Sequence, residues 1–307
     1  MSESSKSLRV LLLGANGQVG RAWQETLHGV NVVAALGRDQ LDIGDLDRLG
    51  DRLYDLAEAI KPNVIVNAAA YTAVDRAEDE EQLAYDINAL APGVIASVAS
   101  NLGVPMVHYS TDYVFDGHGQ APFIETDAPS PLSVYGRSKL AGERAVQAVG
   151  GAHLILRTSW VFGVHGQNFL KTMLRLAQTR DELRVVNDQV GAPTSADLLA
   201  KVPSQMLQQI QHPSDPRWGV YHLCPTGYTS WHGYAVYLIE KAREMGWPIQ
   251  LANESIIGIA SSEFPVKARR PHNSRLSTQK LQQTFAIALP DWRVGVDQVL
   301  QVLEPGA

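Results

Sequence analysis

The sequence predicts an α/β fold in which a doubly wound parallel sheet is followed by a smaller C-terminal lobe. Short apolar runs rich in Val, Leu and Ile alternate with stretches of helical periodicity in the first half of the chain, and this alternation is typical of βαβ units. A glycine-rich turn directly follows the first apolar run. After about residue 160 the alternation gives way to helices separated by polar and proline-rich stretches, which indicates a second, less regular unit.

The expected elements follow from this periodicity. Buried strands are predicted at Arg9–Leu13, Val30–Ala35, Val64–Asn67, Val104–Ser110 and His153–Thr158. Helices are predicted from Leu46 to Ile60, before Pro62, and from Leu83 through Leu90 to Val98. Further helices are expected near Asn168–Arg180, Ser195–Gln211 and Trp231–Gly246.

Composition and charge limit the partners and the cellular compartment that we expect for the protein. The 307 residues carry a formal net charge of −6 without a basic run, which argues against a nucleic-acid partner. Cys224 is the only cysteine, so an internal disulfide is excluded and a reducing compartment is indicated. No apolar run approaches the roughly 20 residues of a membrane span, and Met1–Lys6 lacks the apolar core of a signal peptide. We therefore expect a cytoplasmic protein with no membrane partner.

Gly14, Gly17 and Gly20 form a GxxGxxG turn between the first strand and the first helix. Glycines allow the backbone to approach a pyrophosphate closely, and the helix N-terminus offers free N–H groups and a positive dipole end. The spacing resembles that of short-chain dehydrogenases of the extended type. We expect residues 1–160 to form a Rossmann-like dinucleotide-binding domain and residues 161–307 to form mainly a substrate-binding lobe, with later sheet elements returning near 190–225.

The end of the second strand bears on the choice of cofactor. Dinucleotide folds usually place a carboxylate here to accept hydrogen bonds from the adenosine ribose, but this chain has Gly37 and then Arg38. Arginine can pair with a 2′-phosphate, so NADPH is favoured and NADH is expected to be accepted. Two alternatives stay open: Arg38 is a solvated loop residue, or Asp39 and Asp42 take over the ribose contact.

Tyr135 and Lys139 lie four residues apart, which places them on one face of a helix. A free phenol has a pKa near 10, and a neighbouring ammonium is expected to lower that pKa. A lowered pKa suits a general acid that protonates a carbonyl oxygen as hydride is transferred to the carbonyl carbon. Thr111 follows the fourth strand and Asn67–Ala70 end the third, at the sheet edge where open α/β sheets bind ligands. The alternative is that Tyr135 and Lys139 are helix-surface residues and that Thr111 only ends a strand.

These stretches resemble the dTDP-4-dehydrorhamnose reductase family of the extended short-chain dehydrogenase/reductase superfamily. The family's characteristic stretches occur along nearly the whole chain as GANGQVG, NAAAYTAVDRAE, HYSTDYVFDG, SPLSVYGRSKLAGE, RTSWVFG, NFLKTMLRLA, VNDQVGAPT and RPHNSRL. The resemblance implies reduction of the C4 keto group of dTDP-4-dehydro-β-L-rhamnose by NAD(P)H to dTDP-L-rhamnose. Such a product serves rhamnose-containing cell-surface polysaccharides, such as the O-antigen of lipopolysaccharide.

The resemblance also implies roles for individual residues. Tyr135 would be the proton donor, Lys139 its partner and ribose ligand, and Thr111 a tuning hydrogen-bond donor. The cofactor-binding set is Gly14, Asn16, Gly17, Gln18, Val19, Gly20, Gly37, Arg38, Asp42, Ile43, Ala69, Ala70, Tyr71, Thr72, Tyr109, Tyr135 and Lys139. The substrate-binding set is Thr111, Asp112, Tyr135, Trp160, Asn168, Gln189 and Arg270. Trp160 would be an apolar platform and Arg270 a phosphate ligand; a core Trp160 and a surface Arg270 are the alternatives.

Some members of the family suggest a Mg²⁺-bridged dimer built on glutamates. The corresponding positions here are Ala22 and the apolar pair Val299–Leu300, and Asp197 alone does not make a site. We therefore expect no bridging metal, while a homodimer stays open.

Two competing functions stay open. A sugar-nucleotide 4,6-dehydratase or epimerase needs further acid–base groups, but Asp112 is followed by Tyr113 rather than Glu, and Cys224 lies outside the motifs. A non-catalytic regulatory subunit could share the fold. The complete set of Thr111, Tyr135 and Lys139 favours an enzyme.

Overall fold

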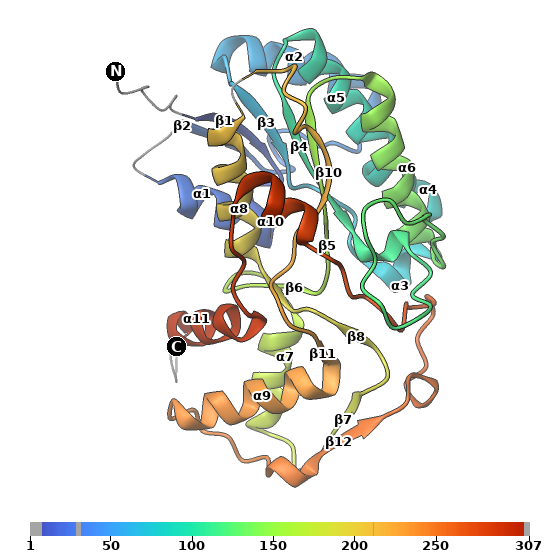
Figure 1. The fold of residues 1–307 in the computed structure, drawn as a ribbon, viewed down its shortest axis with the longest axis vertical. Helices are drawn as coiled ribbons and strands as arrows, with labels where there is room; N and C mark the ends of the chain where they lie inside the picture. The colour runs from blue at the N-terminus through green and yellow to red at the C-terminus, as the bar shows by residue number, and fades with distance from the viewer. Residues whose placement is uncertain (1–7, 29–31, 211, 304–307) are drawn as a thin grey trace.

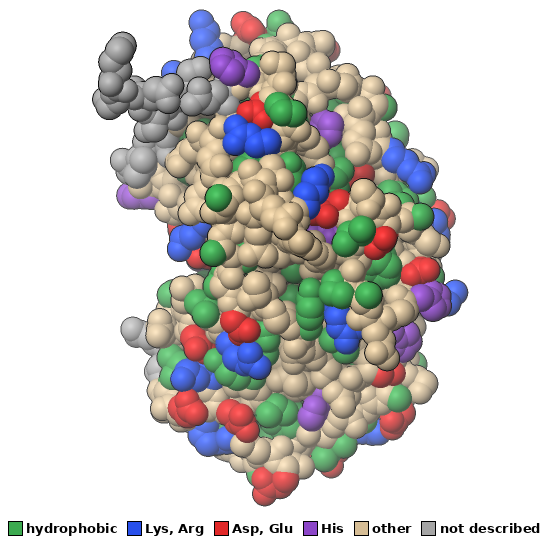
Figure 2. Space-filling view, in the orientation of Figure 1, with side chains coloured by type: hydrophobic (Ala, Val, Ile, Leu, Met, Phe, Trp, Pro, Cys, Tyr) green, Lys and Arg blue, Asp and Glu red, His purple; other side chains and the backbone are tan. Residues whose placement is uncertain are grey.

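The computed structural model describes residues 8–28, 32–210 and 212–303. Met1–Lys6 and the first two residues of the strand expected at Val30–Ala35 lie outside these ranges. A central sheet is covered by helices on both faces, and a smaller lobe containing α7, α9 and α11 lies beyond one end of it (Figure 1). On the face shown in Figure 2, acidic and basic side chains are interspersed. The expected α/β architecture is therefore confirmed.

The central sheet has six parallel strands in the order β10-β5-β4-β3-β1-β2. These strands are β1 (Arg9–Leu13), β2 (Val32–Leu36), β3 (Val64–Asn67), β4 (Met106–Thr111), β5 (His153–Thr158) and β10 (Gly219–His222). β4 begins later than the predicted Val104 because Pro105 has no N–H to donate to the ladder. The strand order reverses between β1 and β3, and open α/β sheets bind ligands in the crevice beyond such a reversal.

Both faces of the sheet are buried, which explains why its strands are continuously apolar. Alternate residues of β1 point to opposite faces: Val10 and Leu12 pack with α1 (Gln18–Leu27), α8 (Ala196–Gln209) and α10 (Gln279–Phe285). Leu11 and Leu13 pack with α2 (Leu46–Ile60), α5 (Ala91–Asn101) and α6 (Val134–Val149). The sheet core is thus a two-sided layer between helices.

The helix expected around Leu83–Val98 is observed as α4 (Glu81–Tyr85), a π-helical turn η1 (Asp86–Leu90) and α5. The wider π turn changes the direction of the side chains. Leu83 and Leu90 are consequently exposed, whereas Asn88 is buried. The expectation of one regular apolar face through Leu83 and Leu90 was wrong.

Together these segments form Glu81–Asn101, a 21-residue helical run that is predominantly apolar. Within the described ranges it is the one helix long and apolar enough, by length and composition alone, to cross a membrane, and the sequence had suggested no such run. More than half of its most apolar stretch is buried, with Ile87 and Ile95 in the core on one face of the sheet. A core helix of an α/β layer passes the same test.

The smaller lobe has a core of its own. It contains α7 (Phe169–Ala177), α9 (Trp231–Glu244) and α11 (Trp292–Leu303), with the parallel pair β7 (Leu183–Val186) and β12 (Ile256–Ile259). Shorter pairs are formed by β6 (Val161–Phe162) with β9 (Thr194–Ser195), and by β8 (Val190–Gly191) with β11 (Thr229–Ser230). α8 packs on the central sheet and β10 is the strand at one edge of it, although both follow residue 160 in the chain.

Candidate active site

A cavity of about 210 Å³ lies where β1, β2 and β3 end. Its wall contains most of the residues expected to bind the cofactor, together with Ala68 from the expected end of the third strand and two residues that were not expected, Leu41 and Ile87. The residues expected to bind the cofactor are Gly14, Asn16, Gly17, Gly37, Arg38, Asp42, Ile43, Ala69 and Ala70.

The glycines of the first turn are required by its geometry. Gly14 has a φ of 81°, and a Cβ there would lie 2.5 Å from the Ala69 nitrogen. A Cβ on Gly20 would lie 2.1 Å from the Gly14 carbonyl oxygen. Gly17 begins α1 without a side-chain cap from any described residue, so the first-turn N–H groups can receive an anion. The turn therefore fits the pyrophosphate of a dinucleotide.

Arg38 and Asp42 share the wall of this cavity. The Arg38 side chain is 77% exposed, and its Nε lies 4.0 Å from Asp42 Oδ1. A pair this exposed holds its geometry weakly. A guanidinium for a 2′-phosphate and a carboxylate for a ribose hydroxyl are therefore both present at this end of the cavity.

Other residues expected near the cofactor make contacts within the protein. The Tyr71 hydroxyl donates to Glu80 Oε2 at 2.5 Å, and Thr72 is exposed. Val19 packs against the sheet core. The Tyr109 hydroxyl accepts from Trp23 Nε1 at 2.7 Å and donates to the Leu199 carbonyl. The Tyr109 hydroxyl is thus bonded within the core, while the Tyr109 carbonyl accepts from Lys139 Nζ; a contact between Tyr109 and the cofactor stays a prediction.

Thr111, Tyr135 and Lys139 meet at the carboxyl end of β4. Thr111 caps the 3₁₀ turn η2 (Asp112–Val114), accepting from the Tyr113 N–H at 3.2 Å. Its side chain is within hydrogen-bonding reach of Tyr135 on α6. One helical turn further, Lys139 is 2% exposed and its Nζ donates to the Tyr109 carbonyl at 2.6 Å. The three residues expected to be catalytic are thus brought together by β4 and α6.

The proton affinities of this set differ from the expectation. Burial raises the pKa of Tyr135 to about 12, although Thr111 acts to lower it. Burial lowers the pKa of Lys139 to about 8, against the opposing charge of Glu143. The net shift of the phenol pKa is therefore upward, because desolvation outweighs the effects that lower it, and the Lys139 ammonium donates to the Tyr109 carbonyl. A protonated Tyr135 at neutral pH is the form that a general acid requires.

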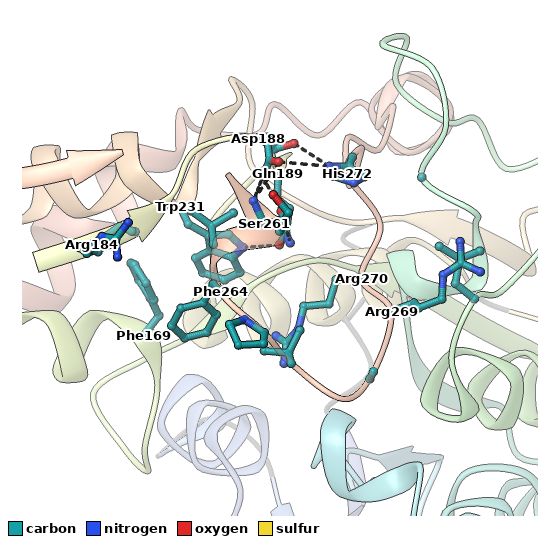
Figure 3. Close-up of a pocket in the computed structure, with 18 of the residues that line it drawn as sticks. Phe169, Arg184, Asp188, Gln189, Trp231, Ser261, Phe264, Arg269, Arg270 and His272 are labelled. Atoms are coloured by element: carbon teal, nitrogen blue, oxygen red, sulfur yellow. Dashed lines mark hydrogen bonds and ion pairs between the residues drawn. The ribbon is translucent and has the colours of Figure 1, made fainter. Parts of the chain in front are cut away.

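A second cavity of about 1150 Å³ lies between the lobe and the segment that follows β4, which contributes Asp116, Gly117 and His118 (Figure 3). Apolar rings from Phe169, Trp231 and Phe264 line it beside the cationic Arg270. Gln189, which was expected here, accepts from Trp231 Nε1 at 3.2 Å and donates to Ser261 Oγ at 3.0 Å. A cavity with apolar walls and a guanidinium suits a ligand that has both rings and anionic groups.

Five of the seven residues expected to bind substrate are not among the described residues that line this cavity. Thr111, Asp112 and Tyr135 lie at the end of β4, in η2 and in α6. Trp160 and Asn168 make other contacts. Trp160, with a φ of 48°, stacks on Trp231 with ring centroids 3.7 Å apart; among the described residues that line the large cavity, Trp231 is present and Trp160 is not. Asn168 caps α7 by accepting from the Lys171 N–H, and its amide donates to Gln18 Oε1 at 2.9 Å. Trp160 therefore supports the ring that faces the cavity, and Asn168 joins the lobe to α1.

The chain is similar to known proteins over nearly its whole length. The family model described as the RmlD substrate binding domain matches residues 8–304. The chain belongs to this family. A dTDP-4-dehydrorhamnose reductase from Escherichia coli K12 is 46% identical over 301 residues, covering 96% of this chain and 98% of that protein. The predicted family is therefore confirmed.

Solved structures agree with this assignment. The dTDP-4-dehydrorhamnose reductase from Bacillus anthracis in complex with NADP is 33% identical, with a TM-score of 0.86, over 97% of this chain and 100% of that one. The reductase from Clostridium acetobutylicum is 37% identical, with a TM-score of 0.85, over 96% and 99% of the two chains. The predicted Rossmann-type fold is confirmed with them.

Asp75 is a residue of this RmlD-family site that the sequence did not single out. It lies on α3 (Val74–Ala77), where Oδ2 lies 2.5 Å from Arg270 Nη2 and Oδ1 accepts from the Ala268 N–H at 3.0 Å. It therefore connects the dinucleotide-binding half to the segment that lines the large cavity. Its partners lie 193 and 195 residues away in the chain, so no local pattern could reveal the contact.

The positions considered for a bridging metal are occupied by other contacts. Ala22 and Val299 are buried among apolar residues, and Asp197 Oδ2 pairs with Lys201 Nζ at 2.8 Å. Across residues 8–28, 32–210 and 212–303, no three His, Cys, Asp or Glu side chains are grouped so as to hold a metal ion. Independence from metal stays a prediction for experiment.

Proposed function

We propose that the protein reduces the C4 keto group of dTDP-4-dehydro-β-L-rhamnose to give dTDP-L-rhamnose, with NADPH as the reductant and NADH also accepted. The observation that carries the proposal is the meeting of Thr111, Tyr135 and Lys139 at the end of β4. The neighbouring strand β3 ends at the small cavity. Relatives named dTDP-4-dehydrorhamnose reductase, including one solved with NADP, support the same conclusion.

The chemistry follows from the protonation states. Bound NADPH supplies a hydride to C4 of the sugar. Tyr135, protonated at neutral pH, gives its proton to O4, so that the ketone becomes a secondary alcohol and the phenol becomes a phenolate. The Thr111 hydroxyl and the Lys139 ammonium stabilise that phenolate. Because phenolate forms only as O4 is protonated, these groups favour the transition state over the ground state.

The binding roles are proposals of the same kind. Arg270 binds the diphosphate of the sugar nucleotide, and Gln189 and Asp112 contact its polar groups. Trp231 replaces Trp160 as the ring that faces the ligand, because Trp160 lies behind it in the stack. The residues of the small cavity bind the cofactor, with Gln18, Val19 and Gly20 contributing the first turn of α1.

The wider setting is also proposed from these features. Residues 1–160 form the dinucleotide-binding domain, and residues 161–307 form mainly the substrate lobe apart from the segments that pack on the sheet. The partner is a sugar nucleotide and no nucleic acid or membrane partner is proposed. The protein acts in the cytoplasm, as a monomer or homodimer, and its product serves rhamnose-containing surface polysaccharide.

The test is an assay of purified protein with a panel of 4-keto sugar nucleotides. We expect loss of NADPH absorbance with the dTDP-4-keto-L-sugar, and a product two mass units heavier than that substrate. A product of unchanged mass would instead indicate an epimerase, and loss of 18 mass units would indicate a dehydratase. Tight NADPH binding without turnover of any substrate would favour the regulatory-subunit alternative.

A further inference from the structure

Behind the catalytic residues lies a buried charged cluster formed by Ser110, Glu143 and Arg157. Their exposed fractions are 4%, 1% and 5%. Glu143 Oε1 accepts from Ser110 Oγ at 2.5 Å and from Arg157 Nε at 2.9 Å, and Oε2 accepts from Arg157 Nη2 at 2.6 Å. The carboxylate therefore receives a two-pronged guanidinium contact and a hydroxyl contact, which is a strong geometry for a buried pair.

The cluster joins β4 and α6, which carry the catalytic residues, to the neighbouring strand β5. Glu143 lies on α6 one turn after Lys139, which in turn lies one turn after Tyr135. Ser110 lies on β4 between Tyr109, whose carbonyl accepts from Lys139, and Thr111. Arg157 lies on β5 directly opposite Ser110 in the parallel register. Glu143 thus fixes α6 relative to the strand that bears Thr111.

Stability alone is a weak reason for such a cluster. Desolvating two charges is costly, and a buried ion pair can often be replaced by apolar side chains without loss of stability. Here the cost is not fully recovered, because Arg157 Nη1 is buried without a hydrogen-bond partner among the described residues. The guanidinium instead lies 5.1 Å from the centre of the Phe115 ring. A role at the adjacent active site accounts for a cluster that packing does not require.

We propose that Glu143 is a positioning residue for the reduction: through Ser110 and Arg157 it fixes the Tyr135–Lys139 face of α6 against the end of β4, and it supplies the buried counter-charge to Lys139. The inference rests on the proposed reductase function. It assigns Glu143 no contact with substrate or cofactor. Its effect on the chemistry passes through Lys139 and Thr111.

The negative charge of Glu143 affects how kcat is expected to depend on pH. The titratable and charged groups around Lys139 are Tyr135 and Glu143 on α6, His108 on β4, Asp112 on η2 and, through Glu143, Arg157 on β5. Burial lowers the Lys139 pKa and Glu143 opposes that effect. Removing the Glu143 charge must therefore lower the Lys139 pKa further, so that the ammonium is lost at a lower pH.

The decisive variant replaces the pair by apolar side chains, Glu143→Met with Arg157→Met, so that no charge is left buried alone. We expect a folded protein whose kcat is reduced at least about tenfold. The alkaline limb of its kcat should move to lower pH, because Glu143 is the group that raises the Lys139 pKa. Lys241→Met with Glu244→Met removes an exposed pair on α9 and serves as the matched control with unchanged kcat. A folded Glu143→Met/Arg157→Met protein with wild-type kcat and pH profile would overturn the proposal.

Ser110→Ala keeps the ion pair and removes only the link to β4. We expect a kcat lowered by about three- to tenfold with the alkaline limb unmoved, because the counter-charge is retained. If the Glu143→Met/Arg157→Met protein does not fold, this variant decides: wild-type kcat in Ser110→Ala contradicts the proposal. Wild-type protein that reduces no 4-keto sugar nucleotide would instead refute the proposed function itself.

Discussion

Replacing Tyr135 by phenylalanine removes one hydroxyl and leaves the ring in place. The ring packs beside Val134, Ala77 and Ala84, so the variant keeps its apolar contacts and its unfolding free energy should change by no more than about 1 kcal/mol. The hydroxyl lies within hydrogen-bonding reach of Thr111 at the end of β4 and is protonated at neutral pH. Loss of a positioned general acid lowers turnover by about 10²–10⁴-fold, which corresponds to about 2.7–5.5 kcal/mol in the barrier.

The assay follows NADPH absorbance with the keto sugar nucleotide at saturation, while cofactor affinity is measured separately by fluorescence titration. We expect kcat of Tyr135→Phe to fall by that range and the NADPH dissociation constant to stay within about threefold. Tyr237→Phe is the matched control, because its hydroxyl donates to Asp297 on α11, in the lobe. A folded Tyr135→Phe protein with kcat within a few fold of wild type would refute the assignment.

Four further outcomes follow from the structure. In calorimetric titration, Arg270→Ala should weaken dTDP binding about tenfold or more and leave NADPH binding unchanged. Asp75→Asn should weaken dTDP binding less, because Asp75 only orients the Arg270 guanidinium. Unchanged dTDP affinity in Arg270→Ala would place the diphosphate elsewhere. Arg38→Ala should lower kcat/KM for NADPH by about five- to thirtyfold and leave kcat/KM for NADH unchanged. The effect is modest because the Arg38 side chain is 77% exposed. Equal losses with both cofactors would contradict the contact to the 2′-phosphate. Dialysis against EDTA should leave kcat unchanged, and restoration by Mg²⁺ of activity lost to EDTA would reveal a metal site. Burial raises the pKa of the Asp112 carboxyl from 3.8 to about 6, so ionisation of this carboxyl destabilises the folded protein as the pH rises from 4 to 6. In urea unfolding, Asp112→Asn should raise the unfolding free energy by up to about 3 kcal/mol at pH 7.5 and leave it unchanged at pH 3.5. Equal increases at both pH values would show that the effect has another origin.

Local periodicity predicted the layer architecture because burial on both faces makes a strand continuously apolar. β1, β3 and β5 begin and end where their apolar runs do, and α2 matches the predicted helix from Leu46 to Ile60. The π turn at Asp86–Leu90 was not predicted, because it depends on packing against α6 rather than on the spacing of leucines. There a Cβ on Gly142 would lie 2.0 Å from the Asn88 carbonyl oxygen.

The sequence by itself determined the chemistry-bearing residues that stand in short motifs. The glycine turn, the Tyr135–Lys139 spacing and the threonine at the end of β4 are local patterns that can be recognised from the sequence alone. Tertiary structure decided what these residues contact. Three contacts depend on segments that are distant in the chain. Lys139 donates to the Tyr109 carbonyl, and Trp231 rather than Trp160 lines the cavity. Asp75 pairs with Arg270. The physical reason is that pKa values, ring stacking and ion pairs depend on burial and on partners, and both are set only when β4, α6 and the lobe pack together.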